Sequence, residues 1–214
     1  RSFNRLYGET LVEPQAVLPQ NTVCHRLPGT DGQAKMSKSI GNCIYLADSK
    51  EEVKRKVMGM FTDPNHLRVQ DPGVTEGNPV FIYLSAFSKD RHFNEYFKNE
   101  ETGKLEYKNL DELKAHYERG GLGDVKVKKF LNYVLEDTLA PIRARRHELE
   151  KHIPEVYQIL FEGSERARIK AAETLSKVKA AIGLNYRTDY DLIKRQVEKY
   201  AQLHAEEEKK TRSR

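Results

Sequence analysis

Apolar residues from residue 48 onward recur three or four positions apart, the spacing that places them on one face of an α-helix. Residues that favour helix starts precede most of these segments, and glycines or prolines follow them. The pattern therefore predicts a series of amphipathic helices. Their predicted starts are Asp48 with Glu51 in a capping box, Asn78-Pro79, Asn109 with Glu112, Asp124, Pro154, Ser164, and either Asp189 or Asp191.

The same periodicity predicts the side chains that face a core, including six aromatic residues whose helical spacing favours packing over stacking on unpaired bases. Gly120-Gly121, Gly163 and Gly183 are predicted to end helices, and Pro141 to kink the longest one. The predicted inward residues are Val53, Val57, Met60, Phe61, Val80, Phe81, Tyr83, Leu84, Phe87, Phe93, Tyr96, Phe97, Leu110, Leu113, Tyr117, Val127, Leu131, Val134, Leu135, Leu139, Ile142, Ala171, Leu175, Val178, Ile182, Ile193, Val197, Tyr200 and Ala201.

Residues 1–46 have a mixed character. Residues 1–7 are predicted to be the tail of a helix that Gly8 ends, and prolines then interrupt the chain around one short predicted strand at Thr22-Val23-Cys24. Because a single strand cannot bury itself, we expect this region to be the last piece of a larger α/β domain. The sequence does not begin with Met, and we expect it to be part of a longer protein. The predicted fold is mainly α, with a helical bundle after this α/β remnant.

Composition narrows the class of protein. Charged residues make up 32% of the 214 residues and hydrophobic residues 38%, with a net charge of +5, which is typical of a soluble protein and permits a polyanionic partner. No stretch approaches the ~18 consecutive apolar residues of a membrane span, and no signal-peptide pattern opens the chain. Cys24 and Cys43 lack a second closely spaced pair of ligands, which favours reduced thiols over a zinc site.

The most informative stretch is Lys35-Met36-Ser37-Lys38-Ser39, which lies between Gly32 and Gly41. It places two ammonium groups three residues apart, with hydroxyl groups beside them, and the flanking glycines let the backbone approach an anion. This pattern is typical of a mobile phosphate-binding loop. A solvated surface turn is the alternative that composition alone allows. A Walker-type loop is excluded, because its glycine spacing before Lys-Ser/Thr is absent.

Lys-Met-Ser-Lys-Ser is also the second signature of class I aminoacyl-tRNA synthetases. The longer stretch from Gly29 to Asn42, with its Leu27-Pro28-Gly29 lead-in, resembles bacterial tryptophanyl-tRNA synthetases. The similarity continues on both sides of the loop and covers nearly the whole chain. It includes Phe3-Asn4, Tyr7-Gly8-Glu9, Glu13-Pro14, Thr62-Asp63 and residues 121–126, 139–143, 162–167 and 180–184.

The resemblance implies a cytoplasmic tryptophan–tRNA ligase that uses ATP with Mg²⁺ to form tryptophanyl-adenylate and then transfers the tryptophanyl group to tRNA(Trp). Lys35 and Lys38 would be the catalytic residues, because they would stabilise charge on the departing pyrophosphate. Met36, Ser37 and Ser39 would complete the site for the ATP phosphates. No metal site formed by protein side chains is expected.

The resemblance also implies a division of the chain by function. Residues 1–46 would be the carboxyl-terminal remnant of a Rossmann-type nucleotide-binding catalytic domain of class I. Residues 47–205 would be an α-helical domain that binds the tRNA anticodon and stem, and residues 206–214 a charged tail. The parent enzyme would be a homodimer.

Two departures from the family and three alternatives complete the expectations from the sequence. The first signature of the family, His-Ile-Gly-His-like, and the tryptophan pocket are absent from these residues, so the isolated chain is expected to lack ligase activity. A tyrosyl-type synthetase shares the fold, a stand-alone helical RNA-binding module would bind tRNA without ATP, and a helical scaffold would bind neither.

A basic stripe on the longest predicted helix is a candidate RNA surface or simply a solvated face. It comprises Lys126, Lys128, Lys129, Arg143, Arg145 and Arg146.

Overall fold

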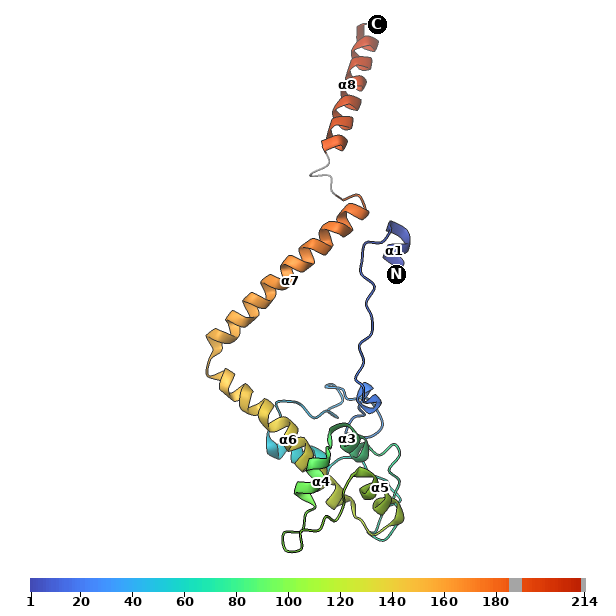
Figure 1. The fold of residues 1–214 in the computed structure, drawn as a ribbon. Coiled ribbons are helices and arrows are strands. Elements are labelled where there is room, and N and C mark those ends of the chain that lie inside the picture. Colours follow the sequence, from blue (N-terminus) through green and yellow to red (C-terminus); the bar gives the residue numbers. More distant parts are fainter. Residues whose placement is uncertain (185–189, 213–214) are drawn as a thin grey trace. The chain divides into compact units, whose positions relative to one another are not determined.

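The computed structural model describes the backbone of residues 1–184 and 190–212, and the side chains of these residues up to residue 205 (Figure 1). Among the described residues, extended pairing is limited to two isolated bridges, Pro28 with Lys35 and Lys98 with Leu105. The prediction of a mainly helical protein is therefore confirmed. The elements are α1 (Ser2–Tyr7), the 3-10 helix η1 (Thr22–His25), α2 (Lys50–Met58), α3 (Pro79–Phe87), α4 (Asp90–Tyr96), α5 (Leu110–Arg119), α6 (Asp124–Glu150), α7 (Ile153–Ala181) and α8 (Tyr190–Arg212).

The chain divides into two compact units. One is Val17–Ile153, and the other comprises Arg1–Ala16 together with Pro154–Arg214. These boundaries differ from the predicted functional boundary after residue 46, because residues 17–46 pack with the helices that follow them. The assignment of separate functions to the parts of the chain stays a prediction.

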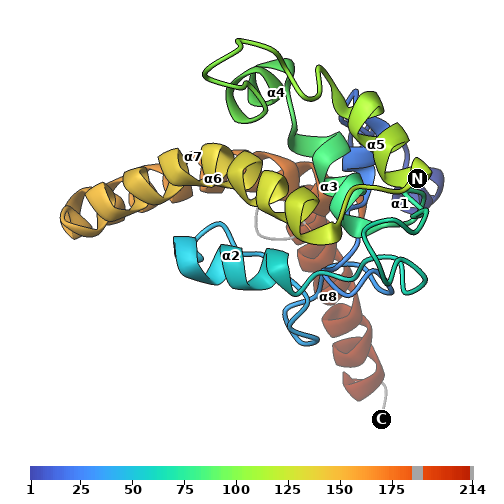
Figure 2. The same cartoon turned by 90° about the horizontal axis from the view of Figure 1, so that it is seen from below.

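Helix α6 is the centre of the unit Val17–Ile153. Phe130, Leu131 and Val134 on this helix have no solvent exposure. Helix α2 lies along one side of α6, and α3 and α4 lie on the other side (Figure 2). The buried core is Val53, Val57, Met60, Val80, Phe81, Tyr83, Leu84, Phe93, Phe97, Tyr107, Leu113, Tyr117, Leu122, Val127, Phe130, Leu131, Val134, Leu135 and Leu139.

Two helix starts follow the predicted local chemistry. At α3 the Asn78 Oδ1 atom accepts the N–H of Val80 at 3.0 Å, with proline in the first helical position. At α5 the Asn109 Oδ1 atom accepts the N–H of Glu112 at 3.0 Å. Gly120, with φ 87°, ends α5 as predicted. Asparagine caps thus fix both starts through bonds made within three residues.

Two other predicted caps are wrong. Helix α2 begins after Ser49, whose Oγ accepts the N–H of Glu52 at 3.2 Å, while the carboxylate of Asp48 pairs with Lys56 at 2.5 Å. Asp124 is the first residue of α6 rather than its cap, and its carboxylate accepts hydroxyl protons from other segments. Each carboxylate is thus used by other partners: that of Asp48 by Lys56 on α2 and by the N–H of Tyr45, and that of Asp124 by two hydroxyl groups.

The 3-10 helix η1 replaces the strand predicted at Thr22-Val23-Cys24. The Asn21 side chain accepts the N–H of Val23 at 3.0 Å, and its carbonyl oxygen accepts the N–H of Cys24 at 3.0 Å. Asparagine favours such local turns, and no neighbouring strand competes with it among the described residues. The strand prediction was therefore wrong.

The core prediction fails at three positions around α6. Phe61 and Ile142 are both 41% exposed, and Tyr96 is 36% exposed although its ring contacts Phe97. Helix α6 also runs on through Pro141 to Glu150. The buried part of this helix ends near Leu139, so Ile142 lies beyond the core that the periodicity assumed.

Helix α7 is continuous through Gly163, where the sequence predicted an end and a new start at Ser164. One glycine inside a helix costs only about 1 kcal/mol, which the neighbouring turns can offset. The helix closes instead near Gly183, as predicted, where φ is 76° and the N–H of Leu184 donates to the Lys179 carbonyl at 2.8 Å. Of the two predicted starts of α8, Asp191 lies in its first turn and Asp189 lies outside the described residues.

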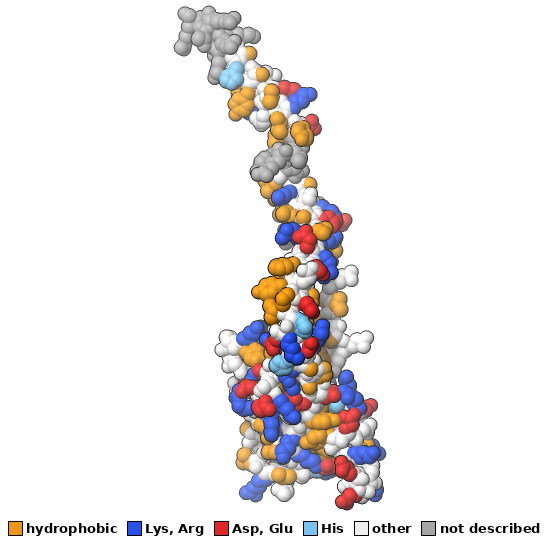
Figure 3. All heavy atoms as spheres, turned by 90° about the vertical axis from the view of Figure 1, so that its left-hand side faces the viewer, with side chains coloured by type: hydrophobic (Ala, Val, Ile, Leu, Met, Phe, Trp, Pro, Cys, Tyr) orange, Lys and Arg blue, Asp and Glu red, His pale blue; other side chains and the backbone are white. Residues whose placement is uncertain are grey.

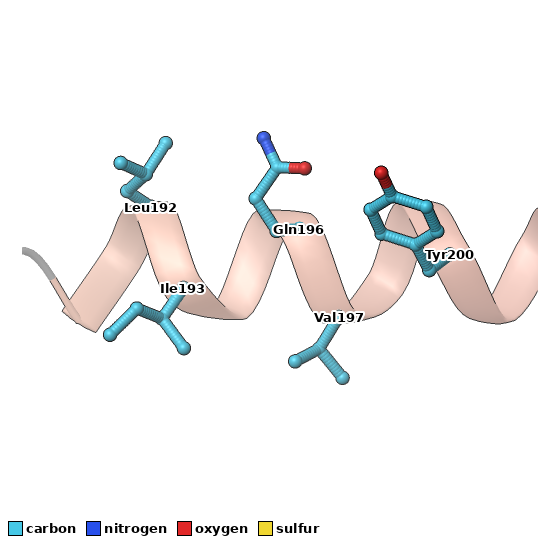
Figure 4. A pocket seen from close by; sticks show the side chains of 5 residues that line it. All are labelled: Leu192, Ile193, Gln196, Val197 and Tyr200. Atoms are coloured by element: carbon cyan, nitrogen blue, oxygen red, sulfur yellow. The ribbon is translucent and has the colours of Figure 1, made fainter. Parts of the chain in front are cut away.

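Apolar side chains on α7 and α8 are exposed rather than buried. Figure 3 shows the apolar side chains of α7 gathered over its first half, where Leu160 and Phe161 are 56% and 63% exposed. On α8, Leu192, Gln196 and Tyr200 form one row and Ile193 and Val197 the row beside it, and together they line a shallow surface hollow (Figure 4). The predicted inward positions Leu175, Ile193, Val197 and Tyr200 are therefore exposed in this structure. Across the described residues, no helix combines the length and the apolar character needed to cross a bilayer.

Candidate phosphate-binding loop

The candidate site is the signature loop, defined as residues 29–42. Backbone hydrogen bonds close its base: the N–H of Gly29 donates to the Ala34 carbonyl at 2.7 Å, and the N–H of Thr30 donates to the Asn42 carbonyl at 3.0 Å. The bridge between Pro28 and Lys35 lies beside them. The loop therefore has a fixed base, from which residues 35–39 project.

Asn42 is the most buried polar side chain in the loop, with 4% exposure. Its Oδ1 atom accepts the N–H of Ser37 at 2.7 Å. Its Nδ2 atom donates to Asp31 Oδ2 at 3.0 Å and to the Lys35 carbonyl at 3.3 Å. One carboxamide thus joins both sides of the loop.

Asp31 uses its carboxylate inside the loop rather than on a lysine. Besides the bond from Asn42, its Oδ1 atom accepts the N–H of Gln33 at 3.3 Å. The hydrogen bond from Asn42 is the main cause that lowers the pKa of the Asp31 carboxyl below its usual value. Asp31 is therefore anionic at neutral pH.

Two glycines are needed for close approaches. A Cβ atom on Gly29 would lie 2.1 Å from Asn42 Nδ2, although the backbone of Gly29 is not in the left-handed region. Gly32 has φ 68°, and a Cβ there would lie 2.8 Å from the ring of Phe61. The exposed Phe61 ring, predicted to be in the core, instead covers this turn.

The helical core holds the base of the loop from two directions. The hydroxyl of Tyr83 on α3 donates to the Pro28 carbonyl at 2.8 Å, and the N–H of Phe61 after α2 donates to the Thr30 carbonyl at 2.9 Å. Burial, followed by the charges of Cys43 and Asp31, raises the pKa of Tyr83 to about 12. The phenol therefore keeps its proton and remains a donor.

The structure brings together all five predicted site residues on the outer part of the loop. Lys35 and Lys38 are exposed, and neither pairs with a carboxylate anywhere in the part of the chain that the structure describes. Ser37 and Ser39 lie with their hydroxyl oxygens 2.9 Å apart. Met36 is half-buried and packs against the hydrophobic core. The catalytic and ATP-binding roles of these residues stay predictions.

The basic stripe on α6 is largely occupied by contacts within the protein. Lys128 is 8% exposed, and its Nζ atom donates to the carbonyls of Met60 at 2.6 Å and Met58 at 3.2 Å, at the end of α2. Burial lowers its pKa. Three other cations have carboxylate partners: Lys126 pairs with Glu106, Arg143 with Glu136 and Arg146 with Glu150. Lys128 is therefore buried and cannot contact RNA, and the choice between an RNA surface and a solvated face stays a prediction for the other basic residues.

Predicted core packing of the aromatic residues is confirmed for four of the six: Phe81, Tyr83, Phe93 and Phe97 are buried. Among the described residues, no three side chains of His, Cys, Asp or Glu are grouped so that they could hold a metal ion. The signature loop is thus the site with the clearest chemical character.

Comparison with known proteins identifies the class. The model of the family "tRNA synthetases class I (W and Y)" matches residues 1–140. The chain therefore belongs to this class I tRNA synthetase family, as the residues of the signature loop suggested.

The relatives narrow the similarity. The chain is 59% identical over 187 residues to the tryptophan–tRNA ligase of Clostridium longisporum, covering 87% of the chain and 50% of that relative. It is 50% identical over the same length to the tryptophan–tRNA ligase of Streptococcus pyogenes serotype M3, covering 51% of that relative. The chain thus spans about half the length of the curated relatives it matches.

Solved structures agree with this assignment. Tryptophanyl-tRNA synthetase from Campylobacter jejuni, in complex with ADP and tryptophan, matches with a TM-score of 0.58 and 28% identity, over 84% of this chain and 50% of that one. The enzyme from Mycoplasma pneumoniae matches with a TM-score of 0.59 over 86% of this chain and 52% of that one. At 22% identity, the second match supports the fold alone.

Sequence reasoning missed the residues that shape the site. Asp31 and Asn42 hold the loop closed, and Tyr83 and Phe61 attach its base to the helices. Asp31 and Asn42 lie on either side of the lysine-bearing segment, and a carboxylate and a carboxamide in such positions can indicate a hydrogen bond within a loop. Tyr83 lies 55 residues from its partner Pro28 and gave no such signal.

Proposed function

We propose that this chain supplies the carboxyl-terminal half of a tryptophan–tRNA ligase. In this proposal residues 1–46 end a Rossmann-type nucleotide-binding domain, and the helices that follow bind tRNA(Trp). The observation that carries it is the signature loop, whose fixed base and exposed Lys35 and Lys38, without a carboxylate partner among the described residues, suit a polyphosphate. The 59% identity to a tryptophan–tRNA ligase supports tryptophan as the amino acid.

The proposed reaction has two steps. A carboxylate oxygen of tryptophan attacks the α-phosphorus of ATP, and the bond to the leaving oxygen breaks, giving tryptophanyl-adenylate and pyrophosphate. A ribose hydroxyl at the tRNA end then attacks the tryptophanyl carbonyl and releases AMP. Negative charge accumulates on the departing pyrophosphate in the first step, where the ammonium groups of Lys35 and Lys38 would stabilise it. One preorganised partner of this kind typically lowers a barrier by about 2.7–4 kcal/mol.

The rest of the loop has a supporting role in this proposal. Ser37 and Ser39 donate hydroxyl protons to phosphate oxygens, and Met36 holds the loop against the core. Mg²⁺ would accompany the ATP and would neutralise part of the charge on its phosphates. The resemblance further supports a homodimeric, cytoplasmic parent enzyme.

The test uses tryptophan-dependent exchange of pyrophosphate into ATP. We expect the isolated 214-residue chain to give no exchange, because the first signature of the family is absent from it. A hybrid in which this chain replaces the matching half of the C. longisporum ligase should give tryptophan-dependent exchange. The matched control is the same hybrid with Lys35→Gln and Lys38→Gln, which should lose about 100-fold or more in exchange rate.

Three outcomes would contradict the proposal. Exchange by the isolated chain would show that the chain is active alone. Exchange with tyrosine instead of tryptophan would indicate a tyrosyl-type enzyme. A folded hybrid without exchange, together with salt-dependent tRNA binding by the chain, would favour the stand-alone RNA-binding module.

A further inference from the structure

The Asn42 carboxamide uses both of its functions at once. Its oxygen accepts the N–H of Ser37 at 2.7 Å, and its nitrogen donates to the Asp31 carboxylate at 3.0 Å and to the Lys35 carbonyl at 3.3 Å. The side chain is 4% exposed, so water cannot readily replace these partners. A buried group with this set of bonds requires a donor and an acceptor on the same side chain.

The residues bonded to Asn42 are those next to the two lysines. Ser37 lies between Lys35 and Lys38, and the other bond is to the carbonyl of Lys35 itself. Asp31 in turn accepts the N–H of Gln33, on the opposite arm of the loop. Breaking the bond between Asp31 and Asn42 would therefore release both arms.

We propose that Asp31 and Asn42 form a latch that sets the conformation of the signature loop and so positions Lys35 and Lys38. Both are positioning residues, because they act through the backbone of the lysine-bearing segment. The conformational part of this inference stands on the hydrogen bonds alone. Its consequence for phosphate binding rests on the proposed function.

The latch makes a specific prediction for an Asn42→Asp substitution. The new carboxylate would face the Asp31 carboxylate at hydrogen-bond distance, where a donor is needed. Two carboxylates this close cannot both be ionised without repulsion, so they share a proton at lower pH. The loop should therefore open near neutral pH and close again in mild acid.

The other titratable groups near the latch do not interfere with this test. They are the Cys43 thiol, 3.9 Å from Asn42 Oδ1, and the Tyr83 hydroxyl, which donates to Pro28. The pKa of Tyr83 is raised to about 12, first by burial. The Tyr83 phenol therefore keeps its proton between pH 7 and about pH 5, and comparison with wild type at the same pH cancels contributions common to both proteins. Any change between pH 7 and about pH 5 therefore belongs to the carboxyl pair.

Hydrogen exchange of the Ser37 amide in the full 214-residue chain reports on the latch directly. Each variant is compared with wild type at the same pH, which cancels the intrinsic pH dependence of exchange. Asn42→Asp should speed exchange at least about tenfold at pH 7, and this ratio should fall towards one at about pH 5. The double variant Asp31→Asn/Asn42→Asp exchanges donor and acceptor between these two positions but leaves the Lys35 carbonyl without its donor, so it should restore part of the protection at both pH values.

Asn99→Asp is the matched control, because the Asn99 Oδ1 atom only accepts backbone protons, from Glu101 at 3.0 Å and Thr102 at 2.9 Å. This substitution should leave Ser37 exchange unchanged. The latch is refuted if Asn42→Asp leaves Ser37 exchange near the wild-type rate. It is also refuted if the ratio does not fall in acid, or if the double variant fails to restore protection.

Binding of inorganic pyrophosphate by the hybrid ligase, with and without the substitutions and measured by calorimetry, separates the latch from the proposed function. Asn42→Ala adds no charge and should weaken binding about tenfold, whereas Lys35→Gln/Lys38→Gln should abolish it. If the lysine variant binds like wild type, or wild type does not bind, the proposed function fails and the exchange data still decide the latch. If the lysine variant fails to bind but Asn42→Ala binds normally, the positioning role is refuted.

Discussion

The carboxylate of Asp124 joins three segments of the helical unit. Its Oδ1 atom accepts the Tyr117 hydroxyl of α5 at 2.6 Å, and its Oδ2 atom accepts the Thr62 hydroxyl at 2.9 Å. Tyr117 has no solvent exposure, and its ring lies against His66 and Phe81 with centroids 4.5 and 4.8 Å apart. Tyr117→Phe removes only the hydroxyl and leaves these ring contacts in place.

The cost of this change follows from the type of bond. A hydrogen bond to a charged acceptor contributes about 1.5–3 kcal/mol, and no cavity larger than one oxygen atom is created. We therefore expect Tyr117→Phe to lower the free energy of unfolding by about 2 kcal/mol. For a unit of this size that corresponds to a fall in Tm of about 5–10 °C.

Thr62→Val provides the coupled partner. It removes the other hydroxyl donor with little change of shape, and we expect it to cost about 1–2 kcal/mol. Once one donor is lost, the half-buried carboxylate can turn towards water, so the second bond contributes less. The double variant should therefore cost less than the sum of the single variants, by about 0.5–1 kcal/mol.

The assay is urea unfolding followed by tyrosine fluorescence or near-ultraviolet circular dichroism, because the chain has no tryptophan. Far-ultraviolet signals would mix in the exposed helices α7 and α8. The reasoning is refuted if Tyr117→Phe costs less than about 0.5 kcal/mol, the usual range for surface changes. Strict additivity with Thr62→Val would also contradict a shared acceptor.

Three further predictions test the loop and the core. Gly29→Ala should speed hydrogen exchange throughout the signature loop about 30-fold or more, because its Cβ would lie 2.1 Å from the Asn42 carboxamide. Gly41→Ala is the control: its Cβ would have no atom within 4 Å, so it should show only the backbone cost of its φ of 77°, about 1 kcal/mol, and equal effects of the two variants would contradict the steric argument. The free energy of unfolding should fall as pH rises from about 10 towards 12, because the pKa of Tyr83 is about 12 in the folded state and about 10 in the unfolded state, so the unfolded state loses its proton first. Unfolding monitored by absorbance would contradict this prediction if the free energy of unfolding did not change over that pH range. Phe130→Ala should cost about 3–5 kcal/mol in urea unfolding, and a cost under about 1.5 kcal/mol would show that the side chain is not in a tightly packed core.

The parts of the fold that could be predicted are those set by neighbours in sequence. Asn78 and Asn109 cap their helices through amide groups two or three residues ahead, so their positions were readable. Asp48 and Asp124 look like equally good caps, but their carboxylates are bound by Lys56 and by two hydroxyl groups from other segments. A side-chain partner outside the first turn of the helix can override a local capping preference, and periodicity gives no sign of it.

Burial on the last helices could not be predicted for a different reason. The stripe that contains Leu175 and the stripe that contains Val197 have the spacing of a core-facing surface, yet both residues are more than half exposed. Spacing tells which residues share a face of a helix, whereas burial depends on whether another element covers that face. For α6, which α2, α3 and α4 cover, the same spacing predicted the core correctly as far as Leu139.

The signature loop combines a hydrogen-bonded base with two lysine ammonium groups, and only the lysines could be recognised in the sequence. Lys35 and Lys38 carry no ion pair among the described residues, even though Asp31 lies four positions before Lys35. The carboxylate is instead held by Asn42 Nδ2 at 3.0 Å, which also lowers its pKa. Asp31 thereby shapes the loop without neutralising the lysines. A loop that forms its hydrogen bonds before the ligand arrives leaves both ammonium groups available to an anion and reduces the ordering cost of binding it.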